Sequence, residues 1–533
     1  MSLPPETAAP RAAHDVTHGD VAKGAGAALL SRLGAVIEIV AQPAYTLMFG
    51  LATYGLYTVL WSLVNLVENV ADLGMTSALQ RVVPQAASED AAVAALRSAL
   101  VLALVPCTLI AAGASIGAPW IADIVNVAPA DRPALATGVA LFAWALPLWA
   151  FIEIGTSALR ARRAFGPEIR LRIVWEQVIR LVVATGLWLA GVDTLGLLIA
   201  HLVSLTITAA ACVRLLSRYY DLRLLLRGRR VPGMMHETAL AGLSVLPSNV
   251  IGRVFSDAPP VILNLLIPGA GGATAAGLYG IARKLSSLIQ LVRMAFGYVM
   301  GPLASAVARH DRRAIQPLYG FATRLSTVLA LPIAATIIAA ADMLVRFFGK
   351  EAAPAATVLI PLAVARAVEA IGGPAGAVQQ VASKRLQPVV NSLSGLAVAA
   401  LVATVAFAVL PDVGPVAMAL AVGAGLVVSS GFSVWQLHRA DGLNPFFPPF
   451  GRAVGVALLA CGAVFALLEA TRLLPFAARV PLLPPIMFGG LWMSVRYGLG
   501  EADKDAFGKL AARLRLRRPE PTTINPGRTP PLP

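Results

Sequence analysis

Long apolar segments follow one another along the chain, separated by short polar stretches. Most are about 18 to 25 residues long, which at about 1.5 Å per residue of helix spans about 30 Å of hydrocarbon. They are continuously apolar and lack the period-two alternation of membrane β-strands, so helices fit better than a barrel. About fourteen spans are predicted, at 26–50, 55–80, 92–115, 133–158, 171–191, 194–216, 239–266, 274–305, 318–345, 355–380, 387–410, 414–436, 450–471 and 479–498.

Composition agrees with this pattern. Of 533 residues, 57% are hydrophobic and only 13% are charged, too few charges for a soluble protein of this length to cover its core. The sequence therefore predicts an all-α integral membrane protein. The net charge of +15 does not indicate nucleic-acid binding, because no basic stretch is interleaved with exposed aromatic residues.

Basic residues gather in alternate loops, and this bias predicts the orientation. Lys and Arg are several-fold more frequent in the loops on the side of the N-terminus than in the loops on the opposite side, as the positive-inside rule requires for cytoplasmic loops. Both termini are therefore expected to be cytoplasmic. Examples of these loop residues are Arg160, Arg162, Arg163, Arg223, Arg227, Arg312 and Arg313.

No loop exceeds about 25 residues, so no soluble catalytic domain is expected. The chain also shows no zinc motif, nucleophile elbow or phosphate-binding loop. A membrane-embedded glycosyltransferase or polysaccharide ligase would need catalytic groups in a sizeable outer loop, and the outer loops are short and nearly bare. We therefore expect neither an enzyme nor a cofactor or metal site.

A short sequence echo indicates an internal repeat. Span two begins with Gly55-Leu56-Tyr57 and span eight with Gly277-Leu278-Tyr279, and Leu63 and Leu66 recur at the same offset of 222 residues (279 − 57). Six spans separate the copies, so both have the same orientation. That arrangement is a parallel repeat about an axis normal to the membrane, with substrate expected between the halves.

At these residues the chain resembles the polysaccharide-flippase branch of the multidrug/oligosaccharidyl-lipid/polysaccharide (MOP) exporters. The similarity lies in Gly-Leu-Tyr before an apolar helix with Ala71-Asp72-Leu73-Gly74-Met75, in Ala158-Leu159-Arg160-Ala161-Arg162, and in 276–288 with Arg283, and it covers most of 26–440. It implies two pseudo-symmetric six-helix bundles around a V-shaped cavity, followed by two further helices. The expected division is an N-terminal tail at 1–24, bundles at 25–218 and 237–440, a basic linker at 219–236, two extra helices at 441–500 and a basic, Pro-rich tail at 501–533.

The resemblance also implies a function and a location. In that family the cargo is a saccharide on a polyprenyl diphosphate carrier, passed from the cytoplasmic to the outer leaflet of the bacterial inner membrane. Membrane lipid and this lipid-linked saccharide are the expected partners, and a polysaccharide polymerase or other assembly protein is a candidate for the tail. Two alternatives stay open: a multidrug or cation antiporter of the same superfamily, and a flippase for the lipid-linked peptidoglycan precursor.

Ionisable residues deep in the spans are the candidate site, because they are costly in a bilayer and usually face protein or water. Arginine suits a diphosphate, since its planar fork binds phosphate oxygens in pairs. On the implied architecture, spans one, seven and eight line the cavity. We therefore expect phosphate contacts from Arg32, Arg253, Arg283 and Lys284.

Acidic residues in the spans are candidates for ion coupling, and they keep the antiporter alternative open. They are Glu38, Glu68, Asp72 and Asp257. Glu68 and Asp72 are four residues apart and so share a helix face; pairing with an arginine from another helix is expected for them. Three intrahelical pairs are also predicted, and each can be structural or bind substrate: Glu176 with Arg180, Arg253 with Asp257, and Arg366 with Glu369.

Overall fold

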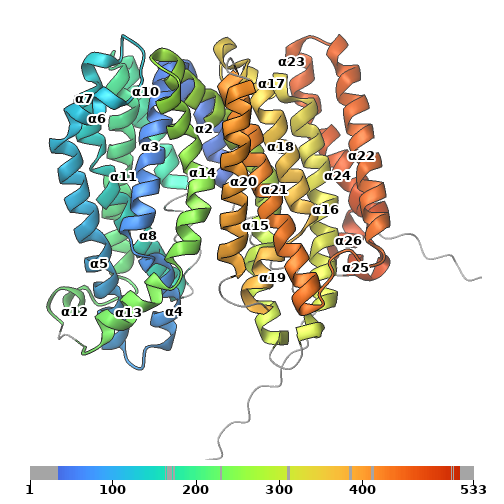
Figure 1. The fold of residues 1–533 in the computed structure, drawn as a ribbon, viewed down its shortest axis with the longest axis horizontal. Coiled ribbons are helices and arrows are strands. Elements are labelled where there is room, and N and C mark those ends of the chain that lie inside the picture. The colour runs from blue at the N-terminus through green and yellow to red at the C-terminus, as the bar shows by residue number, and fades with distance from the viewer. Residues whose placement is uncertain are drawn as a thin grey trace, which may run out of the picture.

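The computed structural model describes residues 34–162, 164, 171, 174–228, 231–308, 312–382, 387–409, 413–505, 507 and 509–516. The helices of these residues form two bundles side by side, with further helices at the outer edge of the second (Figure 1). The predicted fold class, an all-α membrane protein of two bundles with C-terminal helices added, is therefore confirmed.

The first bundle contains the chain up to Leu216. Its longer helices correspond to the first six predicted spans, and two of those spans are broken by turns. The helices are α2 Gly34–Phe49, α3 Leu51–Ala71, α4 Met75–Val82, α5 Glu89–Ile116, α6 Ala118–Ile124, α7 Arg132–Phe142, α8 Ala145–Ala161, α10 Glu176–Leu189 and α11 Thr194–Leu216.

The linker between the bundles contains α12 Leu222–Arg227, and α13 Met234–Leu243 follows it. Span seven, predicted at 239–266, consists of the end of α13 followed by α14 Leu246–Leu266, with a bend of 46° between the two helices. Pro247 stands in the first turn of α14, where its missing N–H costs nothing and its ring prevents the preceding helix from continuing. The bend lets α13 pack against α4 and α5 while α14 packs against α3 and α15.

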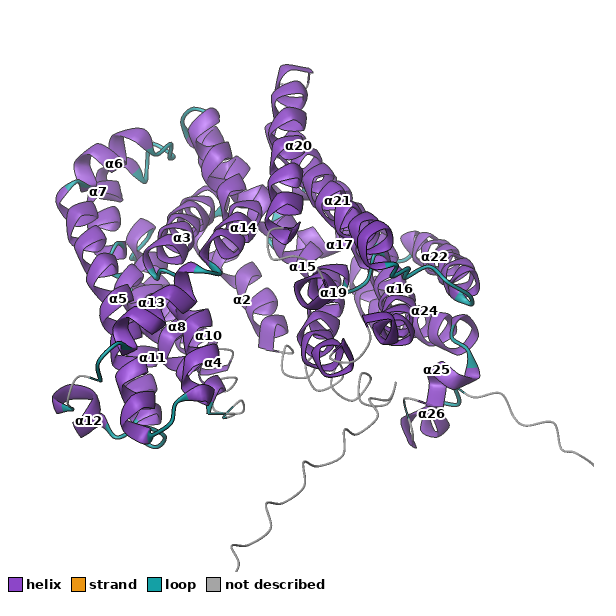
Figure 2. Cartoon of the chain, turned by 60° about the horizontal axis from the view of Figure 1, so that its bottom comes forward, coloured by secondary structure: helices purple, strands orange, loops and turns teal. Residues whose placement is uncertain are grey.

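The second bundle follows, and the last helices pack on its outer side. Seen from below, α22 and α24 lie beside α16 at the edge of the molecule (Figure 2). The helices are α15 Ala270–Ala308, α16 Gln316–Ala339, α17 Ala341–Arg346, α18 Ala355–Ile371, α19 Ala375–Ala382, α20 Gln387–Val409, α21 Gly414–Asp441, α22 Phe450–Ala470, α23 Phe476–Arg479, α24 Leu483–Gly498, α25 Glu501–Asp505 and α26 Lys509–Arg513.

The start of the predicted C-terminal tail is packed rather than solvated. Arg324 of α16 makes a bidentate ion pair with Asp503 of α25, with Nε and Nη2 at 2.9 and 2.7 Å from the two carboxylate oxygens. Both side chains are almost fully buried. Residues 517–533 of the tail lie outside the described part.

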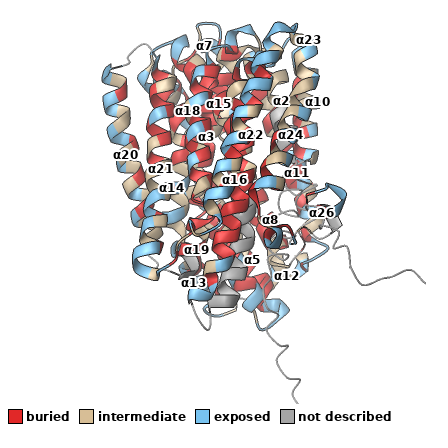
Figure 3. Ribbon diagram, turned by 90° about the vertical axis from the view of Figure 1, so that its right-hand side faces the viewer, coloured by how far each residue is buried: buried red, intermediate tan, exposed pale blue. Residues whose placement is uncertain are grey.

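Exposure matches a protein surrounded by lipid. Large apolar side chains are exposed on the perimeter, among them Leu109, Leu401 and Leu459, and the enclosed helices α3, α15, α16 and α18 are largely buried (Figure 3). An exposed apolar belt of this extent is expected when hydrocarbon covers it. Within the described part, eight helices are long and apolar enough to cross a membrane, or nine if α13 and α14 form one span. The count of fourteen spans stays a prediction.

The two copies of the sequence echo meet at their glycines. A Cβ atom on Gly277 would lie 2.9 Å from the carbonyl oxygen of Leu51 and 3.2 Å from the Cα of Gly55, and a Cβ on Gly55 would overlap the carbonyl oxygen of Ala273. Only glycine permits this approach of two backbones. The equivalent helices α3 and α15 therefore pack against each other near their first turns, which the predicted orientation places on the outer side.

Candidate functional site

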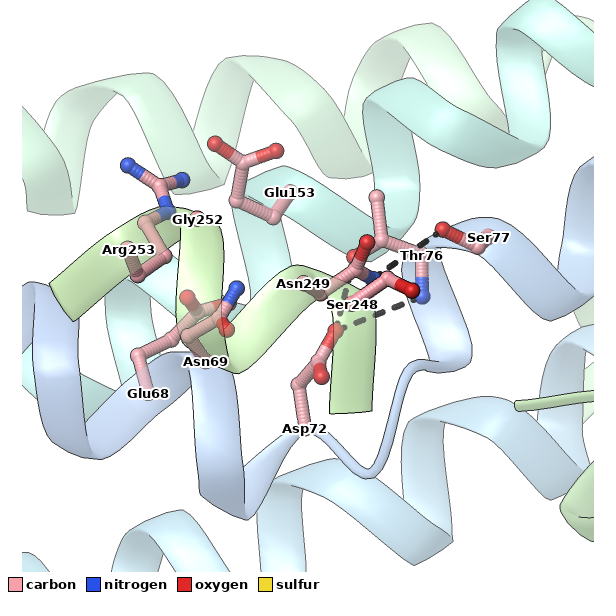
Figure 4. A pocket seen from close by; sticks show the side chains of 10 residues that line it. All are labelled: Glu68, Asn69, Asp72, Thr76, Ser77, Glu153, Ser248, Asn249, Gly252 and Arg253. Atoms are coloured by element: carbon pink, nitrogen blue, oxygen red, sulfur yellow. Dashed lines mark hydrogen bonds between the residues drawn. The ribbon is translucent and has the colours of Figure 1, made fainter. Parts of the chain in front are cut away.

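A polar pocket of about 360 Å³ opens where α3, α4 and α8 of the first bundle meet α14 (Figure 4). Three carboxylates line it, and each belongs to a residue that is at least nine-tenths buried. The remaining walls are amide and hydroxyl side chains, a glycine and one arginine. The lining residues are Glu68, Asn69, Asp72, Thr76, Ser77, Glu153, Ser248, Asn249, Gly252 and Arg253.

A tight turn shapes one wall of this pocket. Leu73 and Gly74 adopt positive φ angles of 52° and 75°, which ends α3 and lets α4 start at Met75 in a new direction. The Asp72 carboxylate accepts hydrogen bonds from the Gly74 backbone N–H at 2.6 Å and from the Thr76 hydroxyl at 3.0 Å. Span two was predicted as a single helix, and this prediction is wrong because the turn divides it.

The expectation that Glu68 and Asp72 share a face is confirmed, since both line the pocket. The expected arginine partner for Asp72 is wrong: its carboxylate is held by the hydrogen bonds of its own turn. The pocket does contain an arginine, Arg253 from α14, on the side of Glu68 and Glu153 and away from Ser77 (Figure 4).

Arg253 connects the pocket to a cluster of charges between α14 and α15. Its Nη1 lies 3.7 Å from Asp257 Oδ2, and Arg283 Nη1 lies 2.9 Å from Asp257 Oδ1. Arg283 also donates to the backbone oxygen of Ser256. The predicted intrahelical pair of Arg253 and Asp257 is therefore present but is the longer contact. Arg283, which has no acidic neighbour in sequence, has its acidic partner on the preceding helix.

A second cluster of the same composition lies between α15 and α18. Arg366 Nη1 is 2.9 Å from Glu369 Oε2, as the sequence predicts, and Arg293 Nη2 from α15 is 3.3 Å from Glu369 Oε1. The side chain of Glu369 is 7% exposed and that of Arg293 is 33% exposed. The carboxylate is thus enclosed, while part of the Arg293 guanidinium stays accessible.

Both clusters carry more positive than negative charge. Each has two arginines around one buried carboxylate, and arginine is always protonated in proteins. With the carboxylate ionised, each Arg–acid–Arg triad has a net charge of about +1. An anion that reaches the accessible guanidinium edges would complete the neutralisation. Each triad therefore offers guanidinium groups that can accept an anionic group.

Other predicted site residues lie elsewhere. Lys284 is half-buried on α15 beside Arg283. Arg32 lies outside the described residues, and Glu38 falls in α2 with its side chain outside them. The predicted pair of Glu176 and Arg180 is formed, with both side chains at least 95% buried.

That buried pair continues into the core of the first bundle. Arg180 Nη1 lies 3.2 Å from the Tyr57 hydroxyl, which is 3.1 Å from His201 Nδ1. The His201 ring lies 4.2 Å from that of Trp61 and is fully buried. His201 is therefore a hydrogen-bonded packing residue of this core.

The sequence matches the family described as "Polysaccharide biosynthesis protein" over residues 48–357, more than half of the chain. The chain belongs to this family. No curated protein sequence matches it.

Solved structures share the fold at low sequence identity. The "Lipid II flippase MurJ, inward closed conformation" superposes with a TM-score of 0.66 at 10% identity, over 88% of this chain and 97% of that one. An inward-facing multidrug resistance MATE transporter of the MOP superfamily superposes with a TM-score of 0.64 at 15% identity, over 79% of this chain and 98% of that one. A variant of the Vibrio cholerae MATE transporter VcmN superposes with a TM-score of 0.60 at 13% identity, over 81% of this chain and 99% of that one. The fold shared with these transporters and the long apolar helices of the described residues identify a multi-pass membrane protein.

Sequence reasoning missed Glu153 as a lining residue of the pocket. The signal was present, because Glu153 interrupts the apolar segment 145–159 just as Glu68 interrupts span two. Asn249 and Ser248 were also missed, and nothing in sequence distinguishes them from other polar residues near a helix start. Only the packing of α14 against α3 brings them to the pocket.

Proposed function

We propose that this protein moves a polyprenyl-diphosphate-linked saccharide from the cytoplasmic to the outer leaflet of the bacterial inner membrane, by alternating access of its two bundles. The observation that carries the proposal is the pair of Arg–acid–Arg triads on α14, α15 and α18. Membership of a polysaccharide biosynthesis family supports the saccharide as cargo.

The triads suit the diphosphate for reasons of charge and geometry. A diphosphate that joins a lipid to a sugar carries a negative charge on each phosphate group, and guanidinium forks bind such oxygens in pairs. Arg283 and Arg293 are ten residues apart on α15, about 15 Å along the helix. We infer that they are successive contacts along the path rather than one site.

The glycine contact between α3 and α15 supports an alternating mechanism. Gly55 and Gly277 bring the two bundles together on the predicted outer side, while the acidic pocket lies at the opposite end of α3. In this conformation a cargo would enter from the cytoplasmic side, and opening at the glycines would release it outside. A contact between two equivalent backbone segments can separate without breaking side-chain bonds.

The experiment is to delete the gene in its host and to measure both secreted polysaccharide and the leaflet location of the polyprenyl-linked saccharide. We expect polysaccharide to be lost and the precursor to accumulate on the cytoplasmic side. Wild type should restore both, whereas a stably expressed Arg283→Ala/Lys284→Ala variant should restore neither. Unchanged polysaccharide and unchanged precursor location, in a host without a redundant transporter, would contradict the proposal.

A cation or drug antiporter is the second candidate, and the acidic pocket favours it. Three carboxylates against one arginine would suit a cationic cargo or a coupling ion, and the MATE structures named above share the fold. Purified protein in liposomes separates the two: an antiporter releases a preloaded cationic dye when a proton or sodium gradient is applied, and a flippase for lipid diphosphates does not. A peptidoglycan-precursor flippase would be recognised by loss of viability on deletion and by movement of that precursor.

A further inference from the structure

We propose that the acidic pocket holds the sugar directly attached to the diphosphate, and that it selects neutral or amino sugars over sugars that carry a carboxylate. The inference depends on the proposed function, because it assigns the saccharide of that cargo to a place in the structure. It adds a substrate preference that neither the family nor the fold specifies.

The position of the pocket follows from Arg253. This residue lines the pocket and also lies 3.7 Å from Asp257, the carboxylate that Arg283 contacts at 2.9 Å. The side chains of Arg253 and Arg283 are 38% and 25% exposed, so their guanidinium groups can still meet a ligand. A diphosphate held by these two arginines would have its attached sugar beside Arg253. The pocket is the cavity on that side.

The lining suits a sugar because it is rich in hydrogen-bonding groups. Sugar hydroxyls both donate and accept, so amides and hydroxyls bind them in either sense and carboxylates accept from them. Among the described residues, the Asn69 amide oxygen is buried and has no hydrogen-bond partner. The Asn249 side-chain amide donates a hydrogen bond to the Ser77 hydroxyl, with Nδ2 at 3.4 Å from Oγ. A hydrogen bond of this length is weak, so either group can exchange it for a hydrogen bond to a ligand. The volume of about 360 Å³ fits a small part of the cargo rather than a whole oligosaccharide.

The selectivity follows from charge. Of the ten residues that line the pocket, three are acidic and Arg253 is the single base. Glu68, Asp72 and Glu153 are 2%, 4% and 9% exposed, so little water screens them and a like charge nearby is strongly repelled. A uronic acid in this pocket would meet that repulsion. A neutral sugar would meet none, and a protonated amino sugar would be attracted.

The test uses purified full-length protein in nanodiscs and three probes with one lipid: farnesyl diphosphate, farnesyl diphosphoglucose and farnesyl diphosphoglucuronic acid. We expect the glucose probe to bind about tenfold more tightly than the glucuronic acid probe, or better. In Glu68→Gln/Glu153→Gln this preference should fall below about threefold, because two of the three carboxylates are neutralised while side-chain shape is kept. Farnesyl diphosphate itself should bind this variant at least as tightly as wild type, because fewer negative charges face the diphosphate beside Arg253.

Two control variants separate charge from structure. Glu153→Asp keeps the charge and should keep most of the preference, and Glu469→Gln removes an exposed carboxylate paired with Arg472 on the outer side and should change nothing. A wild type that binds both sugar probes equally, or a double variant of unchanged melting temperature that keeps the full preference, overturns the pocket assignment while the proposed function stands. Failure of every diphosphate probe to bind wild type overturns the proposed function as well.

Discussion

Helices α3 and α15 are equivalent in the internal repeat, yet they carry opposite chemistry. Their glycines and tyrosines coincide at the offset of 222, and their backbones touch there. Beyond that point Leu63 and Leu66 still recur, but other positions diverge. Where the first copy has Trp61 and Glu68 in α3 and Asp72 just after it, α15 has Arg283, Gln290 and Met294.

The residues that differ between the two copies lie in different parts of the structure. Trp61 packs in the aromatic core of the first bundle, with its ring 5.1 Å from Trp149, whereas Arg283 reaches α14 to meet Asp257. Glu68 and Asp72 face the acidic pocket. The repeat thus keeps the backbone contact that both halves share, while the first copy carries Glu68 and Asp72 and the second copy carries Arg283. A cargo with a neutral part and an anionic part matches such a division.

The largest expected effect is at Arg283. In Arg283→Gln the buried Asp257 keeps only the longer contact with Arg253, so we expect a loss of about 3 kcal/mol of stability and a fall in transport of about 100-fold. Melting temperature and flipping of a lipid diphosphate in liposomes measure the two effects. Adding Asp257→Asn should restore stability but not transport. Recovery of both would mean that Arg283 serves only the fold.

The arginine of the second copy, Arg283, can be placed at the equivalent position of the first copy, Trp61. Trp61→Arg puts a cation beside the buried His201, which Tyr57 links to the cation Arg180, and should cost about 2 to 3 kcal/mol. Trp61→Phe keeps an aromatic ring and should cost about 1 kcal/mol. Thermal unfolding in detergent measures both. Equal melting temperatures for the two variants would contradict the assignment of Trp61 to packing.

The shared glycine contact should be less costly to disturb. Gly55→Ala forces α3 away from the Ala273 carbonyl, which we expect to cost about 1 to 3 kcal/mol and to lower transport several-fold by hindering closure on the outer side. Gly113→Ala is the matched control, because a Cβ there meets nothing within 4 Å. Labelling of a cysteine introduced on the outer part of α15 should become faster in Gly55→Ala only. Equal labelling of both variants would show that the contact is not a closure.

The smallest effect is expected at the second triad. Glu369→Gln removes the carboxylate that Arg293 and Arg366 share and raises the net charge of that cluster by one. Farnesyl diphosphate should then bind about threefold more tightly, and its release should slow, because the two guanidinium groups lack an internal partner. Titration of the probe in nanodiscs measures this. Weaker binding would place the triad outside the substrate path.

Much of the fold could be predicted from the pattern of apolar residues. Continuous apolar runs of membrane length leave a helix as the way to satisfy the backbone, and the helices of the structure follow the predicted spans closely. The predictions failed where a turn divides a span, as at Leu73 and Gly74, because positive φ angles leave no mark on hydropathy. Two of the candidate ion pairs, Glu176 with Arg180 and Arg366 with Glu369, could be predicted because spacing on one helix fixes them.

The sequence by itself determined the class of protein, the helices, the repeat and the ion pairs within single helices, all of which depend on neighbours along the chain. The tertiary structure alone decided that Asp257 forms an ion pair with Arg283 and that Glu153 and Glu68 line one pocket. It also decided that the backbone at Gly55 contacts the backbone at Gly277. Each of these contacts joins different helices, and its existence depends on how those helices cross. Crossing is set by packing over many side chains at once, which no short stretch of sequence specifies.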